Sequence, residues 1–355
     1  MLIKKTMDFI MDELVEGFNK NEVLSSFSDK VLELIIFPTE QCNFRCTYCY
    51  EDFEIGKMSD DTVQGIKNLL ANRIPHLKRL NLSWFGGEPL LQQKMILDIA
   101  SFAYDLCQQY KVTFTGGFTT NGYLLTPDLL SKFNEINQTS YQISLDGDKE
   151  THNQTRISRA GSATFDRIWN NLIEIKDLKD IQYNITLRVH LTINNFDSTK
   201  SLITKISKHF GNDARFNVHF HKVSDLGGPN NIGVLNHDEY ITRLNILQKQ
   251  LGNDLEHNNE YEINKSSKYI CYAAKANSLT IRANGRIGKC TVALSDPRND
   301  LGKILPTGKL EINNTKLKPW LHGFSDMNEQ SLGCPVSTLH KHKINSEDII
   351  AIEVA

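Results

Sequence analysis

The chain has 355 residues, of which 40% are hydrophobic, and its formal net charge at pH 7 is −2. This length predicts one large domain, or a large and a small one, and the near-neutral charge argues against a protein built to bind nucleic acid or an anionic membrane. The seven cysteines are an odd number, and three of them are crowded together. They therefore favour metal or cluster ligation in a reducing compartment over a secreted disulfide framework.

The first predicted segment, residues 1–30, is helical. Acidic residues at Asp8, Asp12, Glu13 and Glu16 interrupt it, so it lacks the apolar core of a signal peptide. No run of about 18 apolar residues occurs in the sequence, so no transmembrane helix is expected. We therefore predict a cytoplasmic protein with neither a membrane nor a nucleic acid as partner.

Residues 31–225 are predicted to alternate between strand and helix. The expected strands are 31–39, 79–86, 112–122, 140–147, 184–194 and 215–223, and the expected helices between them are 59–74, 90–110, 126–136, 162–178 and 198–210. Because parallel strands need crossover connections, this order predicts the α/β class with a parallel sheet, either open and doubly wound or curved into a partial barrel. In both architectures ligands bind beyond the carboxyl ends of the strands.

The character of the sequence changes after residue 225. Residues 226–268 are predicted to form a bridging loop and a helix, and residues 269–355 a small α+β domain of short strands and turns. The stretch "SLTIRANGRIGKC" indicates a hairpin that turns at Asn284 and Gly285.

The stretch "CNFRCTYCYE" directly follows the first predicted strand and contains Cys42, Cys46 and Cys49. Three buried thiols or a structural zinc are the plain alternatives, but a structural zinc wants four ligands and no fourth cysteine is near. A cubane iron–sulfur cluster bound by three thiolates would keep one iron open for another ligand. The spacing therefore favours a [4Fe-4S] cluster.

This C-x3-C-x2-C pattern, with an aromatic residue at Tyr48, resembles the hallmark of the radical S-adenosylmethionine (SAM) superfamily. The resemblance covers about residues 31–223 and implies a partial (β/α)6 barrel. It also implies that the three thiolates hold a [4Fe-4S] cluster whose open iron chelates the amino and carboxylate groups of SAM. An electron from the cluster then splits SAM into methionine and a 5′-deoxyadenosyl radical, with Tyr48 near the adenine.

The resemblance extends to residues at the ends of the later strands. "FGGEP" is similar to the family's Gly-Gly-Glu-Pro motif, in which Glu88 would accept hydrogen bonds from the ammonium of SAM, although an ordinary turn explains it too. The residues implied to bind SAM are Tyr48, Gly86, Gly87, Glu88, Asn121, Ser144, Arg156 and Asn194. His152 matches a recurrent family histidine, with capping or packing as the alternative. No residue is assigned a catalytic role.

A second group of cysteines, Cys271, Cys290 and Cys334, lies in the C-terminal region. The Gly-x4-Cys spacing that ends at Cys290 resembles the opening of SPASM and Twitch domains, which hold auxiliary [4Fe-4S] clusters. The resemblance thus implies one auxiliary cluster, but Ser337 stands where a fourth cysteine is expected. Its fourth ligand is left open among Ser337, His340, His342, water and a substrate group. Loss of the cluster is the alternative. Cys107 is expected in the core.

The resemblance implies a radical SAM maturase that abstracts hydrogen from a ribosomally made precursor peptide, for example to form a cross-link. A sulfatase-maturating enzyme is one alternative, although Thr291 stands where those enzymes carry an aspartate. A dehydrogenase of a small molecule is another, and a cluster carrier or sensor is the least favoured. The expected partners are the peptide, an electron donor such as flavodoxin or ferredoxin, and a separate recognition protein if the barrel mouth does not bind the peptide itself.

Overall fold

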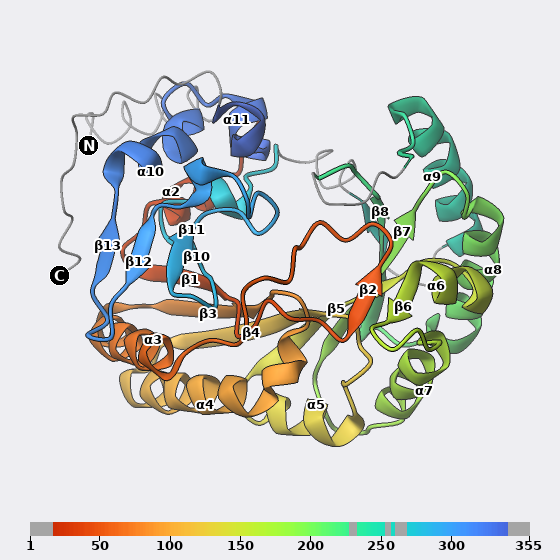
Figure 1. Cartoon of the computed structure of the whole chain (residues 1–355), viewed down its shortest axis with the longest axis horizontal. Helices are drawn as coiled ribbons and strands as arrows, with labels where there is room; N and C mark the ends of the chain where they lie inside the picture. Colours follow the sequence, from red (N-terminus) through yellow and green to blue (C-terminus); the bar gives the residue numbers. More distant parts are fainter. Residues whose placement is uncertain (1–16, 227–232, 253–256, 260–267, 340–355) are drawn as a thin grey trace, which may run out of the picture.

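The computed structural model describes residues 17–226, 233–252, 257–259 and 268–339. Its main feature is an eleven-stranded sheet in the order β13-β12-β11-β10-β1-β3-β4-β5-β7-β8-β9, which curves around an open interior (Figure 1). The central strands are β1 (Val31–Ile36), β3 (Arg79–Trp84), β4 (Thr113–Thr120), β5 (Gln138–Leu145), β7 (Asn184–Leu191) and β8 (Phe216–Lys222). Each pairs in parallel with the next. The predicted six parallel strands and partial barrel are confirmed.

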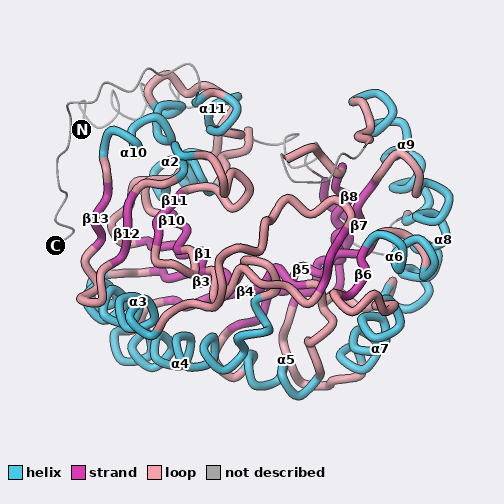
Figure 2. Tube along the Cα trace, viewed as in Figure 1, coloured by secondary structure: helices cyan, strands magenta, loops and turns pink. Residues whose placement is uncertain are grey.

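A helix follows each of the first five central strands and covers the outer side of the curved sheet (Figure 2). These helices are α3 (Asp60–Arg73), α4 (Gln93–Tyr110), α5 (Pro127–Asn134), α7 (Phe165–Lys176) and α8 (Phe196–Phe210), and α9 (His237–Leu251) packs on α8. Local sequence sets where several of them begin. The Ser59 hydroxyl accepts from the Thr62 amide, and Asn236 and Glu239 form a capping box at the start of α9.

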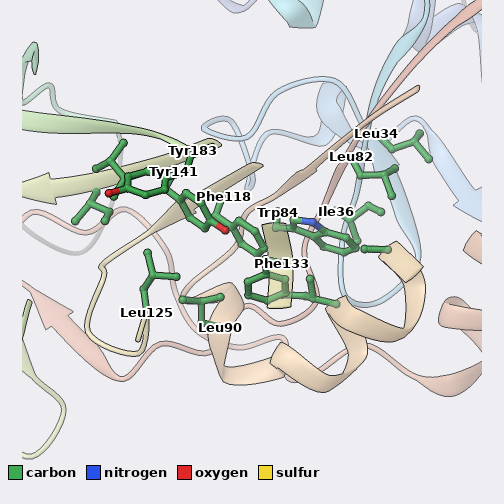
Figure 3. Packing of buried hydrophobic residues seen from close by; sticks show 14 of the residues in the cluster. Leu34, Ile36, Leu82, Trp84, Leu90, Phe118, Leu125, Phe133, Tyr141 and Tyr183 are labelled. Carbon is green, nitrogen blue, oxygen red and sulfur yellow. The ribbon is translucent and has the colours of Figure 1, made fainter. Parts of the chain in front are cut away.

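The core lies between the sheet and these helices (Figure 3). Trp84, Phe118 and Tyr141 occupy successive strands, and the rings of Phe118 and Tyr141 stack with their centroids 5.2 Å apart. The Trp84 indole donates to Gln138 Oε1 at 2.8 Å, which satisfies its polar edge inside the core. Because strand side chains alternate, the other face of the same strands carries polar residues such as Thr119 and leaves the interior open to ligands.

The C-terminal strands extend the same sheet beyond β1. β10 (Ser278–Ile281) pairs in parallel with β1, and β11 (Arg286–Gly288), β12 (Gly302–Ile304) and β13 (Leu310–Ile312) follow in antiparallel order. The predicted hairpin is confirmed, since Gly285 has a φ of +79° in the turn between β10 and β11. The region assigned to a separate domain at 269–355 therefore shares its sheet with the barrel, and the domain division stays a prediction.

The remaining elements are short. They are α2 (Lys20–Ser26), α10 (Asn314–Leu321), α11 (Glu329–Gly333), β9 (His257–Asn259) at the edge beside β8, and the 3-10 segments η1 (Ile74–His76), η2 (Pro89–Gln92), η4 (Tyr272–Ala274), η5 (Pro297–Asn299), η6 (His322–Phe324) and η7 (Pro335–Ser337). Of the predicted helical segment at 1–30, residues 1–16 lie outside the described part, and α2 packs beside the C-terminal region through the Lys275–Glu22 ion pair. No helix in the described ranges is long and apolar enough to cross a membrane.

The sequence reasoning missed a two-stranded ribbon inside the barrel mouth. β2 (Phe44–Cys46) pairs antiparallel with β6 (Arg156–Ser158), which directly follows the short helix α6 (Lys149–Thr155). Strands of three residues carry too little periodicity to be recognised in a sequence. The ribbon matters because it brings Cys46 opposite Arg156.

Candidate active site

A cavity opens at the carboxyl ends of the central strands. The predicted residues that line it are Cys42, Cys46, Tyr48, Cys49, Gly86, Gly87, Asn121, Ser144 and Arg156. They come from the loop after β1, the loops after β3 and β4, the end of β5, and β6. The structure therefore brings together all the residues predicted to bind the first cluster and SAM, except Glu88 and Asn194.

Backbone contacts fix the loop that carries the three thiols. Gly86 has a φ of +107°, and a Cβ atom there would lie 2.2 Å from the Thr39 carbonyl oxygen. A Cβ atom at Gly87 would lie 2.5 Å from the backbone carbonyl oxygen of Gln41. The same oxygen accepts a hydrogen bond from the Glu88 amide at 3.0 Å. The glycines are thus required because two loops touch there, before any ligand is considered.

The three thiols lie in a buried setting. Burial raises the pKa of Cys42, Cys46 and Cys49, in the last case to about 12, and the nearby Arg156 guanidinium opposes the rise at each. Bare thiols here would stay protonated, whereas iron stabilises the thiolate form directly. Three soft donors on one cavity wall, beside a buried cation, fit a [4Fe-4S] cluster, in which each thiolate binds a different iron. Among the described residues, no group of three or more His, Cys, Asp or Glu side chains is placed to hold one metal ion.

A buried hydrogen-bond network holds Tyr48 beside these thiols. Its hydroxyl accepts from Arg156 Nη1 at 2.7 Å and donates to the Asp146 carboxylate at 2.7 Å. Burial alone would raise the pKa of Asp146, but the hydrogen bond from His190 and the charge of Arg156 hold it below its usual range. Burial lowers the pKa of His190 to about 3, so the ring is neutral and donates Nδ1–H to Asp146. The side chain of Tyr48 is therefore fixed from three sides.

Glu88 lies behind the cavity wall. It is fully buried and is not among the residues that line the cavity. Its carboxylate accepts from the Leu90 amide at 3.0 Å, from the Thr120 hydroxyl at 2.6 Å and from the Asn121 amide at 2.7 Å. Since the chain turns into η2 directly after it, Glu88 caps that segment and ties it to the end of β4. Its carboxylate is thus engaged inside the protein, and its role towards the ammonium of SAM stays a prediction.

Asn194 is the second predicted SAM residue that does not line the cavity. It is exposed in the turn after β7, whereas its neighbour Asn195 is buried. The Asn195 amide donates to the His190 carbonyl at 2.8 Å, and its Oδ1 accepts from the Thr192 amide at 2.8 Å. β7 ends at Leu191, whereas the predicted strand runs to residue 194, so Asn194 lies in the turn rather than at a strand end. Its role in binding SAM stays a prediction. His152 is buried against Phe165, which agrees with the packing alternative, and Cys107 is buried in α4 as expected.

Several residues of the cavity were not predicted. Among them, Arg188 and His190 on β7 and His221 on β8 bring basic side chains to its wall. Their signal was present in the sequence, because charged residues at every second position of a predicted strand indicate a polar face. Arg188 also lines a second cavity, together with Thr291 and Tyr272 of the C-terminal region.

The second group of cysteines comes from three separate elements. Cys271 precedes η4, Cys290 follows β11, and Cys334 ends α11. Burial, together with the charges of Cys290 and Cys334, raises the pKa of Cys271 to about 11, so these thiols lie within electrostatic reach of one another. The exposed Ser337 donates its hydroxyl to the Cys334 carbonyl at 2.7 Å. His340 and His342 lie outside the described residues.

Two direct contacts join the cysteine loops of the two regions. The Tyr50 hydroxyl, next to Cys49, donates to the Thr291 carbonyl, next to Cys290, at 3.0 Å. Glu40 and Arg282 form a buried ion pair at 2.5 Å, with side chains 2% and 12% exposed. The two candidate clusters would therefore be held in one connected framework.

Comparison with known proteins gives one family match and several partial relatives. Residues 36–206 match the family model described as the radical SAM superfamily. GTP 3′,8-cyclase of Haemophilus influenzae (strain PittEE) is 28% identical over 185 residues, which are 48% of this chain and 52% of that protein. A cysteine-type anaerobic sulfatase-maturating enzyme of Clostridium novyi (strain NT) is 29% identical over 193 residues, covering 51% of this chain and 48% of that enzyme. The chain spans about half the length of the curated relatives it matches.

Solved structures show the same fold at low identity. The structure titled native anSMEcpe with bound AdoMet and Kp18Cys peptide has a TM-score of 0.60 and 23% identity, and the match covers 77% of this chain and 78% of that one. Streptococcus suis SuiB has a TM-score of 0.53 and 16% identity, with 78% and 64% covered. These matches extend well beyond residues 36–206, so the shared fold includes more than the barrel core.

Proposed function

Because residues 36–206 match the radical SAM superfamily model, we propose that the chain cleaves SAM reductively and uses the resulting radical to abstract hydrogen from a peptide. The observation that carries the first step is the placement of Cys42, Cys46 and Cys49 on one cavity wall, with Ser144 and Arg156 lining the same cavity. A cluster of this kind, when bound, supplies the electron that splits SAM into methionine and a 5′-deoxyadenosyl radical.

The protein's own residues would bind and orient SAM. Ser144, at the end of β5, offers a hydroxyl, and Asn121 offers an amide that also donates to Asn43 Oδ1 at 2.8 Å. Arg156 is buried and its guanidinium is partly used by Tyr48, while its Nε has no hydrogen-bond partner among the described residues. A buried donor without a partner is costly, so the carboxylate of SAM would be a suitable acceptor for it.

The peptide substrate is the finer part of the proposal. Two structures of similar fold contain a bound peptide: anSMEcpe has the Kp18Cys peptide, and SuiB has the precursor peptide SuiA. They are the reason for proposing a ribosomally made peptide as the substrate of this chain. The two cavities share Thr119 and Arg188, and together they extend from the thiols to Tyr272 and Thr291, which would give room for an extended segment of peptide. We propose an auxiliary [4Fe-4S] cluster at Cys271, Cys290 and Cys334, and an electron donor such as flavodoxin or ferredoxin.

The first test concerns the SAM cluster. Replacement of Cys42, Cys46 and Cys49 by Ala, followed by anaerobic reconstitution, should abolish formation of 5′-deoxyadenosine in the presence of dithionite and SAM. Cys107→Ala removes a thiol from the core instead and serves as the matched control. Normal 5′-deoxyadenosine formation by the triple variant would end the proposal.

A second candidate is sulfatase maturation, because one curated relative and one fold neighbour are of that kind. Sulfatase-maturating enzymes carry an aspartate directly after the cysteine that corresponds to Cys290. This chain has Thr291 there, which disfavours sulfatase maturation. A synthetic peptide with a cysteine or serine in a sulfatase-type motif separates the two. Formation of an aldehyde on that residue would favour this candidate over a cross-linking maturase.

A further inference from the structure

A small acidic pocket lies beside the main cavity, and its most unusual member is Glu51. We propose that this side pocket binds an alkylammonium group of the substrate, such as a lysine side chain, and that Glu51 receives it. The proposal rests on the proposed function in so far as the substrate is a peptide. Glu51 lines both the main cavity and the side pocket, as do Tyr50 and Leu226.

The Glu51 carboxylate lacks a partner that its burial would demand. The residue is 8% exposed, and its Oε2 is buried with no hydrogen-bond partner among the described residues. Leaving such an acceptor unsatisfied costs about 1–3 kcal/mol, and more if it is charged. Buried polar atoms without partners are rare, so the position calls for a donor that arrives from outside the chain.

The cation nearest to this carboxylate is already engaged. Arg282 donates from Nε to Glu40 Oε1 at 3.1 Å, from Nη2 to Glu40 Oε2 at 2.5 Å, and from Nη1 to the Leu294 carbonyl at 2.8 Å. It therefore balances Glu40 and leaves the carboxyl groups of Glu51 and Asp52, which also line the pocket, without a cation of their own. Burial raises the pKa of Glu51 to about 8, and a cationic ligand would favour its ionised form. The charge of the pocket is complementary to a ligand with one positive group.

The remaining walls select the kind of cation. The side pocket is small and mostly polar, with Val292 and Leu294 completing its lining, whereas Tyr50 and Leu226 also line the main cavity. An alkylammonium group matches this arrangement, because its methylene stem can contact Tyr50 and Leu226 while its head meets the carboxylate. Since the pocket adjoins the cavity of the three thiols, such an anchor would fix the position of the substrate relative to the site of SAM cleavage.

The experiment measures binding rather than turnover. The reconstituted full chain is titrated with Nα-acetyl-lysine methylamide and with the norleucine analogue, which has the same stem without the ammonium, and binding is followed by saturation-transfer NMR. We expect the lysine compound to bind and the norleucine compound to bind at least about tenfold more weakly. Glu51→Gln should remove this preference, whereas Glu54→Gln, which alters an exposed carboxylate nearby, should keep it.

A second variant guards against misfolding of Glu51→Gln. Val292→Lys would place an ammonium of the protein itself in the pocket and should block the lysine compound while Glu51 remains intact. Equal binding of both compounds to the wild type overturns the inference, and so does a lysine preference that survives in either variant. A preference for lysine that depends on Glu51, found together with no SAM cleavage, would remove the proposed function and leave the pocket assignment standing.

Discussion

The two groups of cysteines differ in how the chain assembles them. Cys42, Cys46 and Cys49 lie within one loop of eight residues, and that loop is held by β2, β6 and the two glycines after β3. Cys271, Cys290 and Cys334 come instead from three elements spread along the C-terminal region, and Cys334 is exposed.

Because the two groups are assembled differently, we expect the two clusters to contribute differently to the stability of the fold. The first loop is anchored by backbone pairing and by the buried network around Tyr48, so the protein can hold its shape without metal. The second group gathers three segments that are far apart in the sequence, at η4, β11 and α11, and metal ligation there would add folding free energy directly. Loss of the second cluster should therefore lower the stability of the fold, whereas loss of the first should mainly abolish the proposed cleavage of SAM.

The largest expected effect comes from removing the second group. The triple variant Cys271→Ala, Cys290→Ala and Cys334→Ala should lose about four of about eight irons per chain after reconstitution. Its thermal unfolding midpoint should also fall more than that of the variant lacking Cys42, Cys46 and Cys49. Iron and sulfide analysis and thermal melts of both variants make the measurement. Unchanged iron content would show that these cysteines are structural and that no auxiliary cluster exists.

The next effect concerns the ion pair that joins the two regions. Arg282→Gln removes the partner of a carboxylate that is 2% exposed, so we expect a loss of about 3–5 kcal/mol in the free energy of unfolding. Denaturant titration measures it. The double variant Arg282→Gln and Glu40→Gln should recover part of the loss, because no uncompensated charge then stays buried. A single variant as stable as the wild type would show that the pair contributes nothing to joining the loops.

Glu88 gives a smaller effect of a different kind. In Glu88→Gln one carboxylate oxygen becomes an NH2 group, which cannot accept a hydrogen bond. The Thr120 hydroxyl or the Asn121 amide then loses its acceptor, so we expect a loss of about 1–3 kcal/mol in unfolding free energy. Because the side chain does not line the cavity, SAM affinity should change less than it does in Arg156→Gln, which alters a lining residue. Calorimetric titration with SAM compares the two. A larger loss of affinity in Glu88→Gln would return Glu88 to the binding site.

These contrasts also explain which parts of the site the sequence could predict. A strand pattern of period two and three cysteines in one loop are local signals, and both the six strands and the shared cavity of Cys42, Cys46 and Cys49 followed from them. The exposure of Asn194 could not be predicted, because neighbouring residues in the turn after β7 are exposed and buried in turn. The burial of Glu88 could not be predicted either, because its partners Thr120 and Asn121 come from the end of another strand. Glu51 has no sequence motif, and only the packing of distant segments shows its burial.

The smallest effect tests whether the two regions act as one unit. Tyr50→Phe removes the hydrogen bond to the Thr291 carbonyl, which joins the residues that follow Cys49 and Cys290, and should cost about 0.5–1.5 kcal/mol in unfolding free energy. If this bond depends on an ordered second cluster, the cost should shrink towards zero in the variant lacking Cys271, Cys290 and Cys334. Denaturant titrations of the four proteins in this cycle give the coupling free energy. Additive effects would mean that the loops touch without influencing one another. A measurable coupling would mean that the C-terminal region helps to hold the loop of Cys42, Cys46 and Cys49, on which the proposed SAM cleavage depends.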